Sequence, residues 1–202
     1  MAGISLIVGL GNPGPDYAQT RHNAGFWFID TLAQSQGGVF RLESKFQGGV
    51  CKFSFPRLDG GSKECWLLKP STFMNRSGQA VASLAGFYKI PVTDILAVHD
   101  DLDLPVGTVR IKQGGGHGGH NGLRDITTHL GDNFLRLRIG IGHPGKGNDV
   151  TAYVLSRAPK QEEALIQEGI DNALSVLPLM LSGDLERAMH QLHSRKDSKP
   201  SE

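Results

Sequence analysis

Residues 4–33 read ISLIVGLGNPGPDYAQTRHNAGFWFIDTLA, and this stretch decides the fold class. Its first part, Ile4 to Val8, is a nearly continuous apolar run, which is typical of a strand buried on both faces. A loop rich in Gly and Pro follows as far as Arg21. Apolar residues then recur at helical spacing from Phe26 to Ala33, with Asn23 as the expected N-cap. A buried strand, a loop and a helix in this order indicate an α/β protein.

The same alternation continues through the rest of the chain. The sequence predicts further strands at 46–55, 64–68, 95–98, 106–112 and 135–141. It predicts helices at 81–88 and 123–130, and a C-terminal helical segment that breaks near Pro178 and Gly183. We therefore expect a single-domain, three-layer sandwich over residues 1–193, in which helices flank a mixed, mostly parallel twisted sheet. The polar residues 194–202 are expected to form a disordered tail.

Composition and charge exclude several classes of protein. The formal net charge is only +1, so any contact with nucleic acid must use a local basic patch, and a DNA-coating protein is not expected. The N-terminus lacks the features of a signal peptide, and no run of about 18 apolar residues is present to span a membrane. Cys51 and Cys65 lie in apolar, strand-like runs and are expected to be reduced. We expect a cytoplasmic protein with no membrane or DNA partner.

The glycines after the first strand match a dinucleotide-binding pattern. The residues around them do not fit such a site. Residues 9–14 read GLGNPG and match the G-x-G-x-x-G pattern of dinucleotide-binding proteins. In that pattern a helix begins at once, so that its N-terminus meets the pyrophosphate. Here Pro13 and Pro15 stiffen the loop and the helix begins only near Asn23. The acidic residue at the required distance, Asp30, lies inside that helix, so no dinucleotide cofactor is expected.

Polar residues follow three of the predicted strands. Asn12, the pair Met74-Asn75 and the pair His99-Asp100 each lie just past a strand. Ligands of open α/β sheets bind beyond the carboxyl ends of the strands. We therefore expect these residues on one rim of the sheet.

His22 and Asp100 are the candidate catalytic pair. His22 immediately precedes a helix, whose partial positive charge favours the neutral imidazole that a general base needs. Asp100 could accept a hydrogen bond from this ring and stabilise the imidazolium that forms during proton transfer. The residue types alone leave blander roles open. Most histidines are structural or solvated, and Asp100 could instead belong to a solvated turn with Asp101 and Asp103.

Three asparagines and a glycine-rich loop add further candidates. Asn12, Asn75 and Asn121 could hold a carbonyl, orient a water or stabilise an oxyanion, although each could instead serve a turn or a cap. Asn121 is the expected N-cap of the helix that follows it. The loop Gly114 to Gly122 could bind an anion such as phosphate through its backbone N–H groups. Three basic residues could add phosphate contacts near this loop: Lys112, Arg124 and Arg138.

Other chemistries find less support in the sequence. His99, His117 and His120 could hold a metal, but no H-E-x-x-H pattern is present and a glycine-rich loop positions ligands poorly. No G-x-S-x-G pattern indicates a serine hydrolase, and no P-loop pattern indicates a nucleoside triphosphatase.

Taken together and in order, six stretches of the chain resemble one known family. They are Gly9–Gly14, Tyr17–Gly25, Lys69–Gly78, His99–Pro105, Gly114–Arg124 and Arg136–Gly145. Each stretch is short, but the ordered set is similar to that of the bacterial-type peptidyl-tRNA hydrolases and spans most of the chain before the C-terminal helices.

This resemblance implies a monomeric α/β hydrolase, without metal or cofactor, that cuts the ester between a peptide and the 3′-terminal ribose of tRNA. By the resemblance, His22 is the general base and Asp100 its partner. The substrate-binding and tRNA-binding positions that it implies are Asn12, Tyr17, Phe73, Met74, Asn75, Lys112, His120, Asn121 and Arg138. The alternative that we keep open is an RNA-binding or splicing accessory protein on the same scaffold, with no required turnover.

Overall fold

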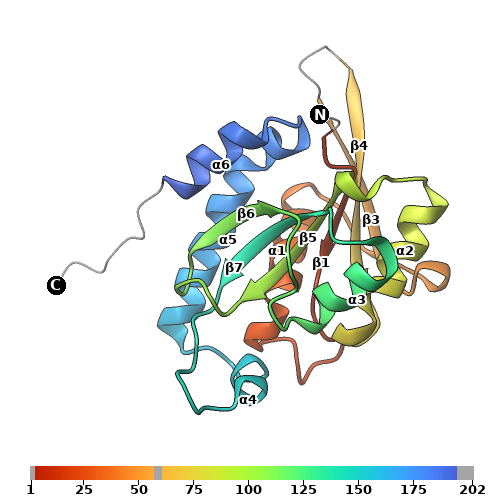
Figure 1. The fold of residues 1–202 in the computed structure, drawn as a ribbon. Coiled ribbons are helices and arrows are strands. Elements are labelled where there is room, and N and C mark those ends of the chain that lie inside the picture. The colour runs from red at the N-terminus through yellow and green to blue at the C-terminus, as the bar shows by residue number, and fades with distance from the viewer. Residues whose placement is uncertain (1–2, 57–60, 195–202) are drawn as a thin grey trace.

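The computed structural model describes residues 3–56 and 61–194, and its centre is a seven-stranded sheet (Figure 1). The strand order is β2-β3-β4-β1-β5-β7-β6. The four central strands β4, β1, β5 and β7 are parallel, and antiparallel strands close both edges. The strands are β1 (Leu6–Gly9), β2 (Arg41–Glu43), β3 (Gly48–Pro56), β4 (Ser62–Pro70), β5 (Ile95–Asp101), β6 (Val109–Gln113) and β7 (Leu135–Gly140).

Helices cover both faces of this sheet, as Figure 1 shows. They are α1 (Ala24–Ser35), α2 (Ser77–Phe87), α3 (Asn121–Leu130), α4 (Val150–Val154), α5 (Lys160–Leu181) and α6 (Leu185–His193). Because side chains alternate along a strand, β1 serves two cores: Leu6 and Val8 pack with α2 and α3, and Ile7 packs with α1, α5 and α6. This arrangement confirms the predicted three-layer α/β fold with a parallel centre.

Several predicted element boundaries are wrong. The helical segment predicted to break near Pro178 and Gly183 continues through Pro178 to Leu181, so only the break at Gly183 is confirmed. Pro178 lies in its last turn, and the lost backbone hydrogen bond is offset by buried neighbours such as Leu177 and Met180. The strand predicted from residue 106 begins at Val109, because the chain first makes a turn closed by a bond from Thr108 N–H to the Pro105 carbonyl. The short elements β2 and α4 were not predicted at all.

Other sequence predictions are confirmed or lie outside the described residues. Cys51 and Cys65 are buried and not disulfide-bonded. Within the described part of the chain, no helix has both the length and the apolar character needed to cross a membrane. Ser194 follows the end of α6, and residues 195–202 of the predicted tail lie outside the described residues.

One close backbone approach brings α1 to the rim of the sheet. A Cβ at Gly25 would lie 2.4 Å from the Val98 carbonyl oxygen and 2.5 Å from the backbone of Leu10. Only glycine therefore lets the first turn of α1 approach the ends of β1 and β5 this closely. His22 lies three residues before Gly25, so this approach holds its ring over the carboxyl end of β5.

Candidate active site

A cleft of about 720 Å³ opens at the carboxyl ends of the parallel strands. It is bounded by the loop after β1, the segment before α2, the end of β5, the glycine-rich loop and α4. Ten of the eleven site residues predicted from the sequence line it: Asn12, His22, Phe73, Met74, Asn75, Asp100, Lys112, His120, Asn121 and Arg138. The predicted rim of polar residues is thus formed, with His99 also in the lining.

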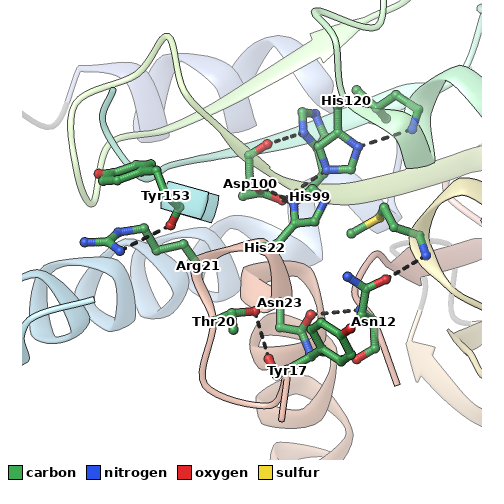
Figure 2. Close-up of polar contacts among 12 residues, drawn as sticks. Asn12, Tyr17, Thr20, Arg21, His22, Asn23, His99, Asp100, His120 and Tyr153 are labelled. Atoms are coloured by element: carbon green, nitrogen blue, oxygen red, sulfur yellow. Dashed lines mark hydrogen bonds and ion pairs between the residues drawn. The ribbon is translucent and has the colours of Figure 1, made fainter. Parts of the chain in front are cut away.

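The carboxylate of Asp100 joins two histidines at the base of the cleft (Figure 2). His22 Nδ1 lies 3.0 and 2.9 Å from the two oxygens of Asp100. His120 Nε2 lies 3.0 Å from Oδ1 of the same carboxylate. Asp100 is 3% exposed and His22 is 9% exposed, so these contacts are largely shielded from water. Hydrogen bonds are stronger where water is excluded, so these contacts hold the two rings and the carboxylate in one arrangement.

The hydrogen bonds of this network determine where the protons lie. A backbone N–H can only donate, and that of Leu123 donates to His120 Nδ1 at 3.3 Å. The proton of neutral His120 is therefore on Nε2, which donates to Asp100. His22 likewise donates through Nδ1 to the ionised carboxylate, which leaves the lone pair of its Nε2 unused. Of the two rings, only His22 has a free basic nitrogen.

Burial and charge shift the pKa values of these groups in opposite directions. Burial favours the neutral acid at Asp100, but the adjacent His22 and His120 outweigh it and hold its pKa well below the usual range. Burial lowers the pKa of His22, but the charge of Asp100 and their hydrogen bond outweigh it, so this pKa is raised above 6.5. His22 is thus a base stronger than an ordinary imidazole.

His99 lies beside this network without joining it. Its Nδ1 donates to the Asp100 carbonyl oxygen at 2.7 Å, and its ring contacts His120 edge to face with centroids 5.0 Å apart. Burial, with the neighbouring His120, lowers the pKa of His99 to about 3. Its ring therefore stays neutral and fixes the orientation of His120 by packing.

Asn12 is held in one orientation by its neighbours. Its Oδ1 accepts from the Met74 N–H at 2.8 Å. Its backbone N–H donates to Asn23 Oδ1 and its carbonyl accepts from Asn23 Nδ2, at 2.8 and 2.9 Å. With the oxygen engaged, Nδ2 is the group that Asn12 offers to a ligand, and Figure 2 shows it on the side toward His22. The side chain of Asn23 orients Asn12 and makes no cap hydrogen bond for α1.

The remaining amides and aromatic rings lie around the mouth of the cleft. Asn75 and Asn121 are exposed in its lining, and Phe73 is 56% exposed beside them. Tyr17 lies outside the cleft lining, and its ring contacts that of Phe73 edge to face at 6.2 Å. The prediction of Asn121 as N-cap is wrong: His120 is the N-cap residue of α3, and Asn121 begins the helix.

The cations at the cleft differ in their exposure and in whether a carboxylate or carbonyl group already pairs with them. Lys112 is exposed, and no carboxylate pairs with it in the described part of the chain. Arg138 donates from Nε to Asp101 at 2.7 Å, so part of its charge is neutralised. Arg136 is 2% exposed and donates to the carbonyls of Gly115 and Gly116. It holds the glycine-rich loop in place, while the third predicted cation, Arg124, does not line the cleft.

The wall formed by α4 was missed by sequence reasoning. Val150, Val154 and Leu155 give the cleft an apolar side. Arg21, next to His22, ties this wall to the turn that carries His22: it stacks on Tyr153 with Cζ 4.1 Å from the ring centroid and donates to Ser156 Oγ at 2.7 Å. A five-residue helix leaves too little periodicity to detect. The one sequence feature that could have indicated this wall is Arg21, a charged residue directly before the candidate base His22.

The histidines considered as metal ligands do not come together. Among the described residues, the group of three potential ligands within 4.8 Å of one another is His22, Asp100 and His120, and it excludes His99 and His117. A metal on His120 Nε2 would require the proton on Nδ1, which is where the Leu123 N–H donates. The hydrogen bonds of His120 therefore require a proton on its Nε2, at the position where a metal ion would have to bind.

Comparison with known proteins identifies close relatives over nearly the whole chain. A family model described as peptidyl-tRNA hydrolase matches residues 6–200. A protein of that name from Pseudomonas paraeruginosa is 56% identical over 198 residues, which is 97% of this chain and 100% of the relative. The namesake from Coxiella burnetii is 52% identical over 193 residues, covering 95% and 98%.

Solved structures agree with the sequence relatives. The crystal structure of peptidyl-tRNA hydrolase from Acinetobacter baumannii superposes with a TM-score of 0.89 at 50% identity, covering 96% of each chain. A complex of a peptidyl-tRNA hydrolase with N-propanol superposes with a TM-score of 0.91 at 49% identity, covering 98% of each chain.

Proposed function

This chain belongs to the peptidyl-tRNA hydrolase family and is an enzyme of that class, and we propose that His22 acts as its general base. The substrate is peptidyl-tRNA, and the bond cut is the ester between the peptide carbonyl and the 3′-terminal ribose. The observation that carries this proposal is the proton arrangement around Asp100. It leaves Nε2 of His22 as the one imidazole nitrogen of the network that can take a proton.

The first step is the formation of a nucleophile from water. His22 Nε2 removes a proton from a water in the cleft, and the resulting hydroxide attacks the ester carbonyl carbon. Asp100 holds the ring in the correct tautomer and stabilises the imidazolium. General-base action of this kind contributes about 10²–10⁴-fold to the rate.

Amide donors meet the negative charge that develops on the carbonyl oxygen. Asn12 is suited to this role because its Oδ1 is already engaged by the Met74 N–H, which leaves Nδ2 to donate. Asn75, exposed in the cleft lining, can supply a second donor. One preorganised donor of this type is worth about 10²–10³-fold.

Collapse of the tetrahedral intermediate completes the reaction. The bond between the carbonyl carbon and the ribose oxygen breaks, and the imidazolium of His22 returns its proton to that oxygen. The products are the peptide carboxylic acid and free tRNA. An ester leaving group needs no further acid, so one base and one set of oxyanion donors suffice.

The tRNA is proposed to approach from the β6–β7 side of the cleft. Lys112, on β6, is exposed and unpaired within the described residues, so it can neutralise a backbone phosphate. Arg138, on β7, adds a second, partly neutralised cation. Residues 1–193 are proposed to act as one domain, because both helical layers pack on the same sheet.

The test is release of free tRNA from an N-blocked aminoacyl-tRNA by the purified wild-type protein, with a metal chelator present. We expect rapid release, and the same N-blocked substrate incubated without the protein measures background ester cleavage. Binding of the substrate without release would support the accessory RNA-binding alternative. Release that disappears in chelator would require a metal in the mechanism.

A further inference from the structure

We propose that a second cavity, on the far side of Asn12 from the tRNA, is the subsite for the residues of the peptide that precede the ester. This inference rests on the proposed function. The cavity measures about 320 Å³ and is called the Trp27 pocket below. Asn12 lines both the Trp27 pocket and the catalytic cleft, so the two cavities lie on either side of the residue proposed to hold the ester carbonyl.

The order of the strands gives the direction of the substrate. Along the rim, β6 and β7 carry Lys112 and Arg138, and β5 and β1 lead to Asp100 and Asn12. The Trp27 pocket comes next in this order, because the end of β4 supplies Lys69 to its lining. An ester joins exactly two parts. With tRNA on the β6–β7 side, the acyl part continues toward β4.

The charge of the pocket favours a peptide over more nucleotides. The cation in its lining, Lys69, lies 2.7 and 2.8 Å from the carboxylate oxygens of Asp30, and its Nζ is also 4.9 Å from the centroid of the Phe26 ring. Since this positive charge is already neutralised, the pocket has little attraction for a phosphate. A peptide chain carries no phosphate, so its binding does not depend on an unpaired cation in the pocket.

The apolar part of the pocket can bind a peptide side chain. Phe26 and Trp27 extend from the first turns of α1 into its lining. The Trp27 ring is fixed by a hydrogen bond from Nε1 to the Ala18 carbonyl at 2.8 Å. A rigid aromatic surface binds an apolar side chain at low cost in conformational entropy. We therefore assign Trp27 to discrimination between short and long peptidyl groups.

The experiment compares two substrates that share the same tRNA and the same esterified residue. One carries an N-blocked aminoacyl group, and the other carries an N-blocked tripeptidyl group with apolar residues. Two variants alter the pocket in opposite ways: Trp27→Ala removes its wall, and Ser71→Trp fills it from an exposed position. For both, kcat/KM for the tripeptidyl substrate should fall about tenfold, as for loss of an apolar subsite, with the aminoacyl substrate unaffected.

Leu155→Ala is the matched control, because it removes an apolar group from the α4 wall of the catalytic cleft. It should leave the ratio of the two kcat/KM values as in the wild type. An unchanged ratio in Trp27→Ala and Ser71→Trp, or a ratio that changes only in Leu155→Ala, would overturn the subsite and leave the proposed function standing. A wild-type protein that hydrolyses neither substrate would overturn both.

Discussion

At the scale of single residues, two histidines bind the same carboxylate, Asp100, but differ in their remaining hydrogen bonds. Both rings donate to its carboxylate, yet His120 also accepts a backbone N–H and His22 does not. His120 is therefore saturated, while His22 keeps one nitrogen for chemistry. The proposal of His22 as the general base rests on this difference in hydrogen bonding, since both rings lie at the same carboxylate.

The first prediction concerns Asp100→Asn. An amide in this position removes the negative charge that raises the pKa of His22 and no longer selects the productive tautomer. We expect kcat to fall by about 10²–10⁴-fold and the acid limb of the pH–rate profile to move to lower pH. The measurement is kcat/KM across pH for both proteins. An acid limb at the wild-type position would show that Asp100 does not set the basicity of the catalytic group.

Sequence reasoning at this scale named the residues now proposed to react but assigned one supporting role wrongly. His22, Asp100 and Asn12 became candidates because each was predicted to follow a strand or precede a helix, and the family resemblance gave them their roles. Asp100 in fact lies inside β5, which extends beyond its predicted end at residue 98 to Asp101. Asn121 was expected to cap α3, because asparagine is among the favoured N-cap residues. His120 takes that position instead, since Asp100 anchors the far side of its ring. No local pattern encodes a contact between residues 20 positions apart.

At the scale of elements, the turn that carries His22 is fastened to α4 and α5. Arg21 donates to Glu162 on α5 at 3.0 Å and stacks on Tyr153 of α4, while Tyr153 donates to the Ile141 carbonyl after β7. Arg21 is 5% exposed, so its charge depends on these partners. His22, the proposed base, and the apolar wall of the cleft therefore share one support.

The second prediction is that Arg21→Gln weakens this support. Breaking a largely buried ion pair should lower the free energy of unfolding by about 2–3 kcal/mol. With α4 less firmly held, KM should rise more than kcat falls. Urea unfolding and steady-state kinetics measure the two effects. Arg157→Gln is the matched control and should cost less, because it breaks the Arg157–Glu163 pair, in which the Arg157 side chain is 56% exposed.

Elements with long apolar patterns were predictable, and those defined by tertiary contacts were not. The buried runs of β1, β5 and β7 and the spacing in α1 decided the α/β class. Pro178 was read as a break because proline disrupts helices, yet the packing of Leu177 and Met180 maintains α5 through it. The bounds of α4 follow from Asp149, whose carboxylate accepts from Thr151 and Ala152 N–H groups.

At the scale of the whole molecule, a net charge of +1 leaves binding of a polyanion to local cations. The third prediction is that Lys112→Ala raises KM with little change in kcat. It should also flatten the dependence of log(kcat/KM) on log salt by about one unit, as expected for one lost phosphate contact. Lys69→Ala is the control, because Asp30 already neutralises Lys69 outside the tRNA side of the cleft. A pure loss of kcat in Lys112→Ala would contradict the assignment.

The fourth prediction is that stability and activity favour different pH ranges. The lowered pKa of Asp100 stabilises the fold above its unfolded value of about 3.9, and this contribution is lost as pH falls. The raised pKa of His22 stabilises the fold below about 6.5, and this contribution is lost as pH rises through the folded value. Both are fully present between about pH 4 and 6.5, whereas the proposed general base must be neutral His22, which prevails at higher pH.

Urea unfolding of wild type and Asp100→Asn at several pH values measures this contribution, because effects of other groups cancel in the difference. The stability advantage of the wild type should be largest near pH 5 and smaller at pH 8. A difference that is constant over this range would mean that the pair does not titrate as described.

The measurement that tests the central claim most directly is single-turnover hydrolysis of N-blocked aminoacyl-tRNA by His22→Ala, with folding verified by circular dichroism and His120→Ala measured beside it. We predict that His22→Ala binds the substrate and loses the pH-dependent hydrolysis, while His120→Ala is slowed but keeps a titrating base. Wild-type rates and an unchanged pH profile in His22→Ala would contradict the account, because another group would then be removing the proton.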